Sequence, residues 1–333
     1  MENIKEAMYF RKLENNAVQC DLCPHGCEIA AGSRGLCKVR SNVEGTLYAE
    51  NYGRVSFIAM DPMEKKPLYH FYPGKYVLSI GTIGCNFKCS FCQNYEIAQE
   101  KAATKYVAPR YLLNLCRSEE DCVGIAYTYN EPNVWFEYIL ETAAMIKQEG
   151  LKNVMVSNGY INPKPLSELL QYIDAFNIDV KGFGEKYYQD ICGGTLHEVQ
   201  KTVEAATEEA HVEITTLIVP GYNDSPEEIK SLAIWLAGID PSIPLHLTRY
   251  YPSYKMSAPP TPLVTIRQLK EVAIEHLDYV YIGNVMGEGL DTTCPSCGAL
   301  LLKRSGGIFI EHLNVDEKQC SKCGKEINII GLQ

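Results

Sequence analysis

The chain has 333 residues, of which 46% are hydrophobic and 22% charged, which is typical of a folded protein and excludes a disordered, collagen-like or coiled-coil chain. Its formal net charge of -10 has the wrong sign for a protein that holds nucleic acid mainly through phosphates, so we expect no nucleic-acid partner. The segment from Met1 to Leu13 mixes charges without an apolar core, and no run of about 18 apolar residues occurs. We therefore expect no signal peptide, no membrane span and a cytoplasmic protein.

The cysteines are the most unusual feature of the composition. There are 14 of them, and because the cytosol keeps thiols reduced, so many would be hazardous unless most were bound to something. Most fall into three groups, and the others stand alone. The first group is Cys20, Cys23, Cys27 and Cys37, the second is Cys85, Cys89 and Cys92, the third is Cys294, Cys297, Cys320 and Cys323, and the isolated residues are Cys116, Cys122 and Cys192. This grouping predicts metal ligands rather than disulfides.

Short β-branched, apolar segments alternate with helical patterns through the middle of the chain, which indicates a parallel sheet with helical crossovers. The predicted strands are, in chain order, Tyr76–Gly81, Cys122–Thr128, Lys152–Ser157, Ala175–Val180, His211–Val219, Pro244–Thr248 and Tyr279–Gly283. One helix is predicted to start at Pro132 and stop at Gly150. Another opens with a capping box of Ser225 and Glu228 and runs to Leu236.

These strand–helix units are too few for a complete eight-fold barrel. The fold class that we expect is α/β, a partial (β/α)6 TIM-like barrel, with its chemistry at the carboxyl ends of the strands. We predict that residues 1–74 form an N-terminal Cys-rich metal-binding extension, 75–288 the partial barrel, and 289–333 a zinc-ribbon-like module.

The central group of cysteines is the most specific motif. Cys85, Cys89 and Cys92 have the spacing C-x3-C-x2-C and directly follow a predicted strand, with an aromatic residue before the third cysteine. Three thiolates without a near fourth ligand would leave one iron of a 4Fe–4S cluster open to bind a substrate. The alternative is a zinc knuckle that takes its fourth ligand from elsewhere.

With this motif the sequence resembles the radical S-adenosylmethionine (radical SAM) superfamily, over residues 75–285. The resemblance implies that Cys85, Cys89 and Cys92 are both metal ligands and catalytic, and that the open iron is chelated by S-adenosylmethionine. It implies reductive cleavage to a 5′-deoxyadenosyl radical that abstracts hydrogen from a substrate. It also implies an electron donor such as flavodoxin or ferredoxin.

The same resemblance implies cofactor-binding residues at two strand ends. The segment with Asn130 and Glu131 is similar to the family's Gly-Gly-Glu-Pro motif, which binds the methionine amino group, although two glycines are replaced. The alternative for Glu131 is a place in the first turn of its helix, where the dipole favours it. Ser157 and Asn158 resemble the Thr-Asn-Gly segment of pyruvate formate-lyase activating enzymes, near the ribose and methionine; Asn158 could instead be a left-handed loop residue.

Two further segments resemble those activating enzymes. Lys181 would neutralise the methionine carboxylate, and Asp179 would face the ribose or the sulfonium. Alternatively the two side chains pair with each other, since their spacing puts both on one side of a strand. His246 takes the place of a strand histidine in those enzymes and would bind cofactor, or would be a core residue.

The first group of cysteines separates one branch of the superfamily. With the segments around His70, Tyr127 and Tyr281, it resembles the AmmeMemoRadiSam-system radical SAM enzymes, and that name points to AMMECR1-like or Memo-like proteins as partners. Its spacing is not that of bacterial ferredoxins. Four thiolates there could bind zinc as a structural site, which we favour. Alternatively, they could bind a second, auxiliary iron–sulfur cluster. His25 could replace one cysteine as a ligand.

At the carboxyl end, two C-x-x-C-G knuckles, Cys294 to Cys297 and Cys320 to Cys323, predict a zinc ribbon, with paired redox thiols as the alternative. Of the isolated residues, Cys116 and Cys122 are predicted to be buried apolar side chains. Cys192 could reach the active face and donate a hydrogen atom or bind substrate.

The leading hypothesis is a radical SAM enzyme of unidentified substrate. Within that class, an activase for a glycyl-radical enzyme of the pyruvate formate-lyase type is the alternative. From another class, the chain could be a metal-binding interaction protein whose central site is vestigial.

Overall fold

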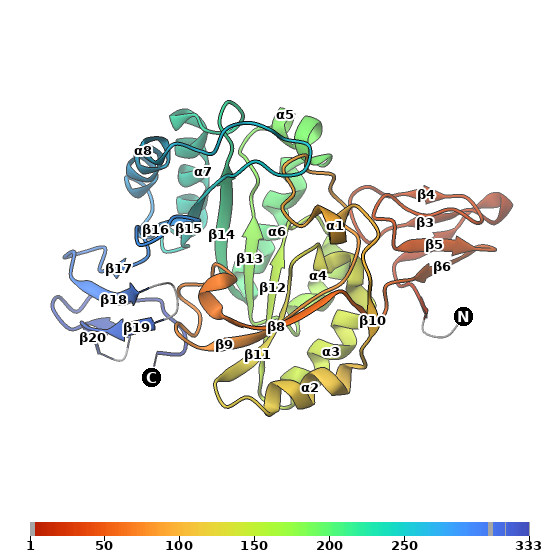
Figure 1. Cartoon of the computed structure of the whole chain (residues 1–333), viewed down its shortest axis with the longest axis horizontal. Helices are drawn as coiled ribbons and strands as arrows, with labels where there is room; N and C mark the ends of the chain where they lie inside the picture. Colours follow the sequence, from red (N-terminus) through yellow and green to blue (C-terminus); the bar gives the residue numbers. More distant parts are fainter. Residues whose placement is uncertain (1–3, 306–308, 317, 333) are drawn as a thin grey trace.

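The computed structural model describes residues 4–305, 309–316 and 318–332. Its centre is a curved, eight-stranded sheet with the order β16-β15-β14-β13-β12-β11-β9-β8, and every strand except β8 runs parallel to its neighbours (Figure 1). The parallel strands are β9 (Tyr76–Gly81), β11 (Cys122–Tyr127), β12 (Lys152–Ser157), β13 (Ala175–Asp179), β14 (His211–Ile218), β15 (Leu245–Arg249) and β16 (Val280–Gly283). All of the predicted strands are confirmed to within one residue at either end.

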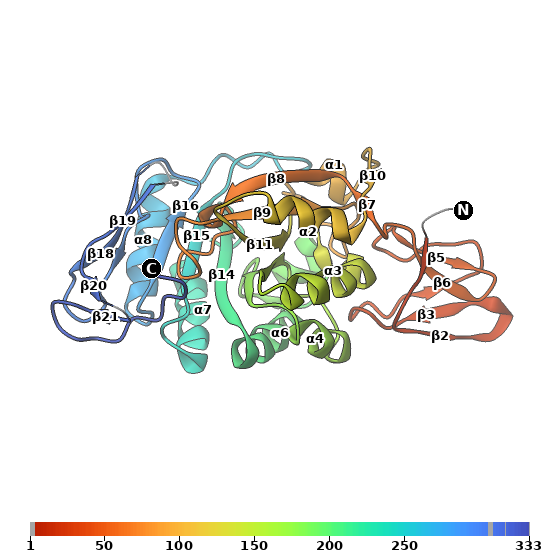
Figure 2. The same cartoon turned by 90° about the horizontal axis from the view of Figure 1, so that it is seen from below.

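Helices connect successive parallel strands and cover the outer face of the sheet (Figure 2). They are α2 (Pro109–Arg117), α3 (Phe136–Gln148), α4 (Pro163–Leu170), α6 (Leu196–Glu209), α7 (Pro226–Ile239) and α8 (Leu263–Ile274). Buried apolar side chains such as Leu112, Ile139, Leu169 and Leu236 lie on the faces of these helices toward the core. No pairing in the described part of the chain joins β8 to β16, so the sheet is an open, partial barrel, as predicted.

The two predicted helix starts show how sequence fixes local structure. Pro132 begins a 3-10 turn, Pro132–Trp135, that continues into α3, and Gly150 follows the helix with a φ of 74°, a conformation that glycine adopts without strain. Ser225 caps α7 by accepting a hydrogen bond from the backbone N–H of Glu228.

A strand that the sequence did not predict lies at one edge of the sheet. β8 (Phe57–Pro62) pairs antiparallel with β9 and is followed by a 3-10 turn, Met63–Lys65. The barrel sheet therefore begins before residue 75, the boundary expected from the sequence. This edge matters because it brings Lys65 and Lys66 beside the strand that precedes the cysteine loop.

Small antiparallel sheets flank the barrel at opposite ends of its long axis (Figures 1 and 2). The N-terminal strands are β1 (Lys5–Glu6), β2 (Phe10–Lys12), β3 (Val18–Cys20), β4 (Glu28–Ile29), β5 (Arg40–Val43) and β6 (Thr46–Ala49), and β7 (Arg54–Val55) pairs with β10 (Lys105–Tyr106). The C-terminal strands are β17 (Thr292–Thr293), β18 (Leu300–Ser305), β19 (Phe309–His312), β20 (Val315–Asp316) and β21 (Gln319–Cys320). We keep the division into three domains as a proposal.

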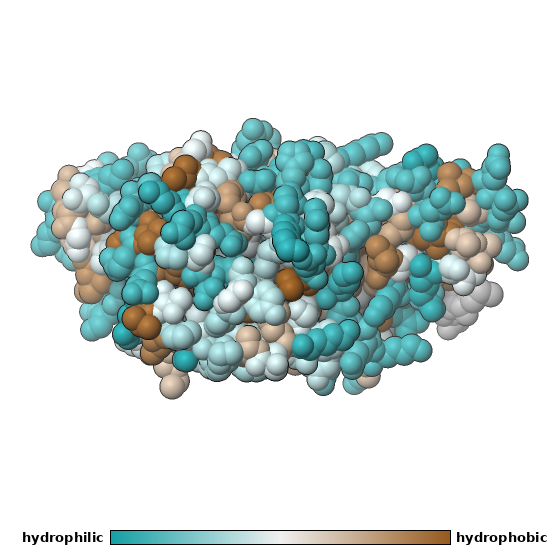
Figure 3. Space-filling view, turned by 90° about the horizontal axis from the view of Figure 1, so that it is seen from above, coloured by the Kyte–Doolittle hydropathy of each residue, from teal (hydrophilic) through white to brown (hydrophobic). Residues whose placement is uncertain are grey.

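One face of the molecule can be seen in a space-filling view (Figure 3). The side of the molecule in Figure 3 is mostly hydrophilic, with apolar side chains in small separate patches. Within the described ranges, every helix falls short of the length and apolar character that a membrane crossing requires.

Candidate active site

The loop after β9 carries the central cysteines. Cys85, Cys89 and Cys92 follow the strand directly and precede the short helix α1 (Tyr95–Ala98). The backbone N–H of Phe87 points to the Cys85 sulfur at 3.3 Å, a contact that stabilises a thiolate. All three sulfur-bearing residues line one cavity of about 340 Å³.

This cavity lies at the carboxyl ends of the parallel strands. Each strand end contributes at least one residue to its wall. The lining residues include Cys85, Cys89 and Cys92 after β9, Thr128 to Glu131 after β11, Val156 and Asn158 from β12, Asp179 and Lys181 from β13, Thr215 and Leu217 from β14, Thr248 from β15 and Asn284 after β16. The expected location of the chemistry is therefore where the structure has a cavity.

Glu131 is the most deeply held acid in this wall. One of its carboxylate oxygens accepts hydrogen bonds from the Ser157 hydroxyl at 2.8 Å and the Asn133 N–H at 2.9 Å, and the other accepts from the Asn158 N–H at 2.8 Å. Burial raises the pKa of Glu131 to about 7, although these hydrogen bonds oppose the shift. Ser157 does not line the cavity but holds this carboxylate from behind.

Asn130 joins the loops after two neighbouring strands. Its side-chain oxygen accepts from the Thr82 N–H at 3.1 Å, and its amide group donates to the Gly84 carbonyl at 2.7 Å. These contacts fix the backbone immediately before Cys85. Tyr129 has a φ of 72°, in the left-handed region that favours glycine, which fits a position where the related motif has glycine.

Asn158 connects the β12 end to the cysteine loop. Its amide nitrogen donates to the side-chain oxygen of Asn86 at 2.8 Å and lies 4.0 Å from the Cys85 sulfur. Its side-chain oxygen accepts from the Tyr160 N–H at 2.9 Å. The side chain is thus fixed at the wall of the cavity next to the first cysteine.

Asp179 and Lys181 form an ion pair, with 2.7 Å between the Lys181 Nζ and a carboxylate oxygen of Asp179. This pairing was the alternative reading of the sequence, and both side chains also line the cavity. Burial alone would lower the pKa of Lys181, but the charges of Asp179 and Cys89 raise it above its usual value. The wall therefore carries a lysine that stays protonated.

His246 does not line the cavity. It lies two residues before Thr248 on β15, one layer deeper in the barrel, and its Nε2 is 2.7 Å from a carboxylate oxygen of the fully buried Glu213. The same carboxylate contacts His211 and the N–H of His70. His246 thus lies in the core, outside the cavity lining, and cofactor binding by His246 stays a prediction from the resemblance.

The isolated cysteines occupy three buried positions. Cys192 ends a π-helical turn, Tyr188–Cys192, and it is not among the residues that line the cavity. Its carbonyl accepts from the Lys88 N–H at 2.8 Å, so the turn supports the cysteine loop. Cys116 and Cys122 are buried against each other, as expected.

Sequence reasoning missed a group of cavity residues that follow β8. Lys66 lines the cavity, is buried, and donates to Asp61 at 2.9 Å, with its Nζ 4.6 Å from the centre of the Tyr129 ring. Burial lowers its pKa. The sequence could have predicted β8, because an apolar run begins at Phe57 and ends in charged and proline residues. The other strands were predicted from the same kind of pattern.

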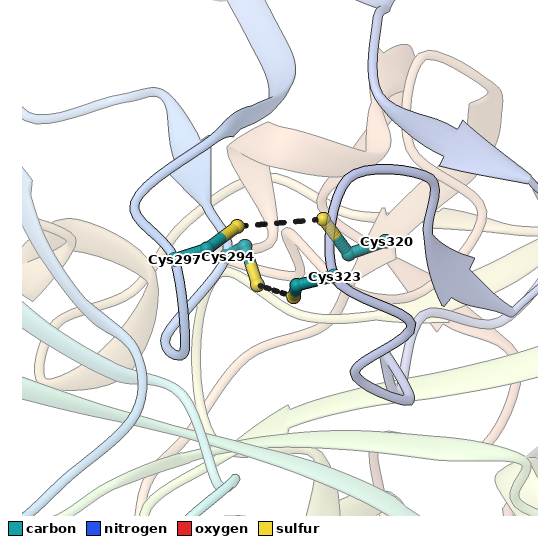
Figure 4. Close-up of side chains that lie close together, drawn as sticks. All are labelled: Cys294, Cys297, Cys320 and Cys323. Atoms are coloured by element: carbon teal, nitrogen blue, oxygen red, sulfur yellow. Dashed lines mark hydrogen bonds between the residues drawn. The ribbon is translucent and has the colours of Figure 1, made fainter.

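Two further cysteine groups lie outside the cavity. Cys20, Cys23, Cys27 and Cys37 surround a separate small cavity of about 20 Å³ in the N-terminal extension. Cys294, Cys297, Cys320 and Cys323 face one another at the C-terminal end, with their sulfurs all within 4.8 Å (Figure 4). The four thiols of this C-terminal group could hold a metal ion.

Comparisons with known proteins agree with the barrel and its cysteine loop. A family model described as the radical SAM superfamily matches residues 79–235. An uncharacterized protein of Methanocaldococcus jannaschii is 42% identical over 338 residues, covering 98% of this chain and 100% of that protein. The pyruvate formate-lyase 1-activating enzyme of Escherichia coli is 22% identical over 161 residues, covering 45% of this chain and 63% of that enzyme.

Among solved structures, Streptococcus suis SuiB bound to S-adenosylmethionine matches with a TM-score of 0.50 and 15% identity. The match covers 61% of this chain and 49% of that chain, and it shows a shared fold. The chain therefore belongs to the radical SAM superfamily, as an enzyme related to the pyruvate formate-lyase activating enzymes.

Proposed function

We propose that Cys85, Cys89 and Cys92 hold the 4Fe–4S cluster of a radical SAM enzyme and leave one iron open for S-adenosylmethionine. The observation that carries the proposal is the lining of the 340 Å³ cavity, which combines these thiols with Glu131 and Lys181. Within the described lining no fourth cysteine and no histidine occurs, so the donor set fits a cluster with one open position. When bound, the cluster and S-adenosylmethionine supply a 5′-deoxyadenosyl radical that abstracts hydrogen from the substrate.

The residues of the cavity wall bind and orient the methionine part of the cofactor. Glu131 would accept a hydrogen bond from the ammonium group, and Lys181 would neutralise the carboxylate. Asp179 would face the ribose or the sulfonium, and Asn158 would lie near the ribose and the methionine. Ser157 is a positioning residue, since its hydroxyl holds a carboxylate oxygen of Glu131 at 2.8 Å. Asn130 is also a positioning residue, because its two hydrogen bonds fix the backbone before Cys85.

Formation of 5′-deoxyadenosine tests the proposal. The protein is reconstituted anaerobically with iron and sulfide, reduced, and mixed with S-adenosylmethionine. We expect 5′-deoxyadenosine from the native protein and only background from Cys89→Ala. Cys116→Ala, which also removes a buried thiol but lies away from the cavity, should keep the activity. Equal product from Cys89→Ala and native protein would contradict the proposal, and absence of product from both would favour a metal-binding interaction protein with a vestigial site.

The substrate class has a second candidate. The relation to pyruvate formate-lyase activating enzymes supports an activase that takes hydrogen from a glycine of a glycyl-radical enzyme. Incubation with such an enzyme should then produce an organic radical in the electron paramagnetic resonance spectrum, and a silent spectrum beside normal 5′-deoxyadenosine formation would favour another substrate.

The protein partners that we propose follow from the same chemistry. Reduction of the cluster needs a low-potential one-electron donor, such as flavodoxin or ferredoxin. AMMECR1-like or Memo-like proteins stay a prediction from the resemblance, which co-purification of the full chain with each candidate would test.

We propose zinc for the C-terminal cysteine group. The Sγ atoms of Cys294 and Cys323 are 3.6 Å apart, and those of Cys297 and Cys320 are 3.7 Å apart. A tetrahedral zinc site with Zn–S bonds of about 2.3 Å separates its sulfurs by about 3.8 Å, which supports a single ion.

A further inference from the structure

The N-terminal cysteines enclose a space that the proposed function does not use. Cys20 ends β3, Cys27 precedes β4 and Cys37 precedes β5, so three short strands hold the group together. The backbone N–H of Cys20 donates to the Cys27 carbonyl at 2.9 Å. The cavity among the four cysteines measures about 20 Å³. It is slightly larger than the roughly 10–15 Å³ that one water molecule needs, so the four side chains leave space between them.

The spacing of the sulfurs differs between the outer cysteine groups. In the C-terminal group all four sulfurs lie within 4.8 Å of one another, as a single ion requires. Across the described ranges, no three sulfurs of the N-terminal group reach this closeness, and neither do those of Cys85, Cys89 and Cys92. A 4Fe–4S cluster needs wider spacing, because each thiolate binds a different iron. In this respect the N-terminal group differs from the C-terminal group.

Arg40 provides a second, independent observation. It lines the same cavity and is only 1% exposed. Its Nη2 donates to both carboxylate oxygens of Glu137 at 2.8 Å, but its Nε–H has no hydrogen-bond acceptor among the residues that the structure describes. A buried donor without a partner is costly. A sulfide or thiolate in the cavity would be an acceptor, and such hydrogen bonds tune iron–sulfur clusters.

The N-terminal group also touches the loop of the central cysteines on both sides of Cys85. His25 Nε2 lies 2.7 Å from the Asn86 carbonyl oxygen, and Asn86 itself lines the N-terminal cavity. On the other side, Gly84 packs so closely on Cys37 that a Cβ atom there would lie 2.6 Å from the Cys37 carbonyl oxygen. The two sites are therefore neighbours through direct backbone contacts.

We propose that Cys20, Cys23, Cys27 and Cys37 hold a second iron–sulfur cluster of the 4Fe–4S type, and that it relays electrons to the central cluster. One electron passes from a flavodoxin-class donor to the second cluster, and from there to the cluster at Cys85, Cys89 and Cys92, which leaves the donor oxidised by one electron. The cavity lined by the four cysteines and the unpaired Arg40 Nε–H lead us to favour an iron–sulfur cluster here over the zinc that the sequence alone favoured. The relay rests on the proposed function, whereas the presence of the second cluster does not.

Metal counting tests the cluster. After anaerobic reconstitution we expect about eight iron atoms and one zinc ion per native chain, and about four iron atoms in the triple variant Cys85→Ala, Cys89→Ala, Cys92→Ala. Cys20→Ala with Cys23→Ala should also keep about four. A native chain with about four iron atoms and two zinc ions, and a triple variant without iron, would overturn the proposal. The iron content of the triple variant reports on the N-terminal cysteines alone, because the ligands of the central cluster are removed. This measurement therefore tests the second cluster even if the proposed reaction does not occur.

Comparing two reductants tests the relay. With dithionite, which can reduce the central cluster directly, the Cys20→Ala, Cys23→Ala variant should form 5′-deoxyadenosine within about twofold of the native rate. With reduced flavodoxin it should be slower by about tenfold or more. Unchanged activity with flavodoxin, or equal slowing with both reductants, would refute the relay. Electron paramagnetic resonance of the reduced triple variant gives a measurement on the second cluster that needs no activity.

Discussion

At the scale of single residues, Glu131 combines burial with three hydrogen bonds to its carboxylate. Because burial outweighs those bonds, its pKa rises to about 7, close to physiological pH. The sequence pointed to this glutamate through its place before Pro132. It did not reveal the pKa, which depends on Ser157 and Asn158 from another strand.

A Glu131→Gln substitution should weaken binding of S-adenosylmethionine by about tenfold to a hundredfold, because it replaces a charge-assisted hydrogen bond by a neutral one. In the native protein the carboxyl becomes protonated as pH falls below about 7, so affinity should fall by up to about tenfold per pH unit below that value. Binding titrations at several pH values measure both effects. The glutamine variant should show no such pH dependence, and the exposed control Glu119→Gln should behave as the native protein; a pH dependence that persists in Glu131→Gln would contradict the assignment.

The buried ion pair of Arg40 and Glu137 allows a stability prediction at the same scale. Both side chains are 1–2% exposed, so removal of the negative partner leaves an unpaired buried charge. Glu137→Gln should lower the free energy of unfolding by about 3–5 kcal/mol. Glu141→Gln, on the same helix α3 but in a half-exposed contact with Lys5 at 3.7 Å, should cost less than about 1 kcal/mol. Anaerobic urea unfolding measures the difference between the two variants. An equal loss of unfolding free energy in both would show that burial does not set the contribution of the Arg40–Glu137 pair to stability.

At the scale of elements, the strands could be predicted because each one is a run of β-branched and apolar residues. Such a run is recognised from neighbouring residues alone and does not depend on residues far away in the sequence. Only one of the two hydrogen bonds of the predicted capping box forms at the start of α7. Ser225 accepts from the Glu228 N–H at 3.1 Å, but the Glu228 side chain turns away to accept from the Phe183 N–H at 2.6 Å. A contact with Phe183, which is distant in the sequence, therefore replaces the capping contact that the local sequence predicts for the Glu228 side chain.

The remaining half of the cap still has a measurable value. Ser225→Ala should lower the free energy of unfolding by about 1 kcal/mol, since one backbone N–H of the first turn loses its acceptor. Ser231→Ala, in the interior of the same helix, should be neutral or slightly stabilising because alanine has the higher helix propensity. Chemical unfolding of both variants checks the contrast, and an equal loss in both would argue against the cap.

At the scale of the whole molecule, the C-terminal sheets attach to the amino ends of the barrel strands, opposite the cavity. Arg304 of β18 donates to the Tyr69 carbonyl at 2.7 Å and to the Thr292 hydroxyl at 2.8 Å. The Tyr281 hydroxyl, near the start of β16, contacts the same Thr292 hydroxyl at 2.8 Å. The cysteine group at this end, where we propose zinc, is thus connected to the core on the side away from the cavity.

Loss of a C-terminal metal ligand should therefore separate stability from activity. Cys297→Ser should release one zinc ion per chain and make residues 289–332 sensitive to protease, because the knuckles lose the ion that joins them. Formation of 5′-deoxyadenosine should stay within about twofold of native. Ser296→Ala, beside the same ligand, should keep the zinc. Loss of 5′-deoxyadenosine in Cys297→Ser with the iron content intact would show that this end contributes to the active site.

The sequence by itself determined where the barrel strands lie along the chain and how the cysteines are grouped, because strand patterns and cysteine spacings are local along the chain. It also pointed to Glu131, Asn158 and Lys181, which follow strand ends that parallel pairing brings together. Only the tertiary structure decided that His246 lies in the layer below the cavity and that Lys66 lies in its wall, since the depth of a side chain depends on the register and curvature of the sheet. The same holds for the closeness of the four C-terminal sulfurs, because the packing of the strands that carry the two knuckles sets it.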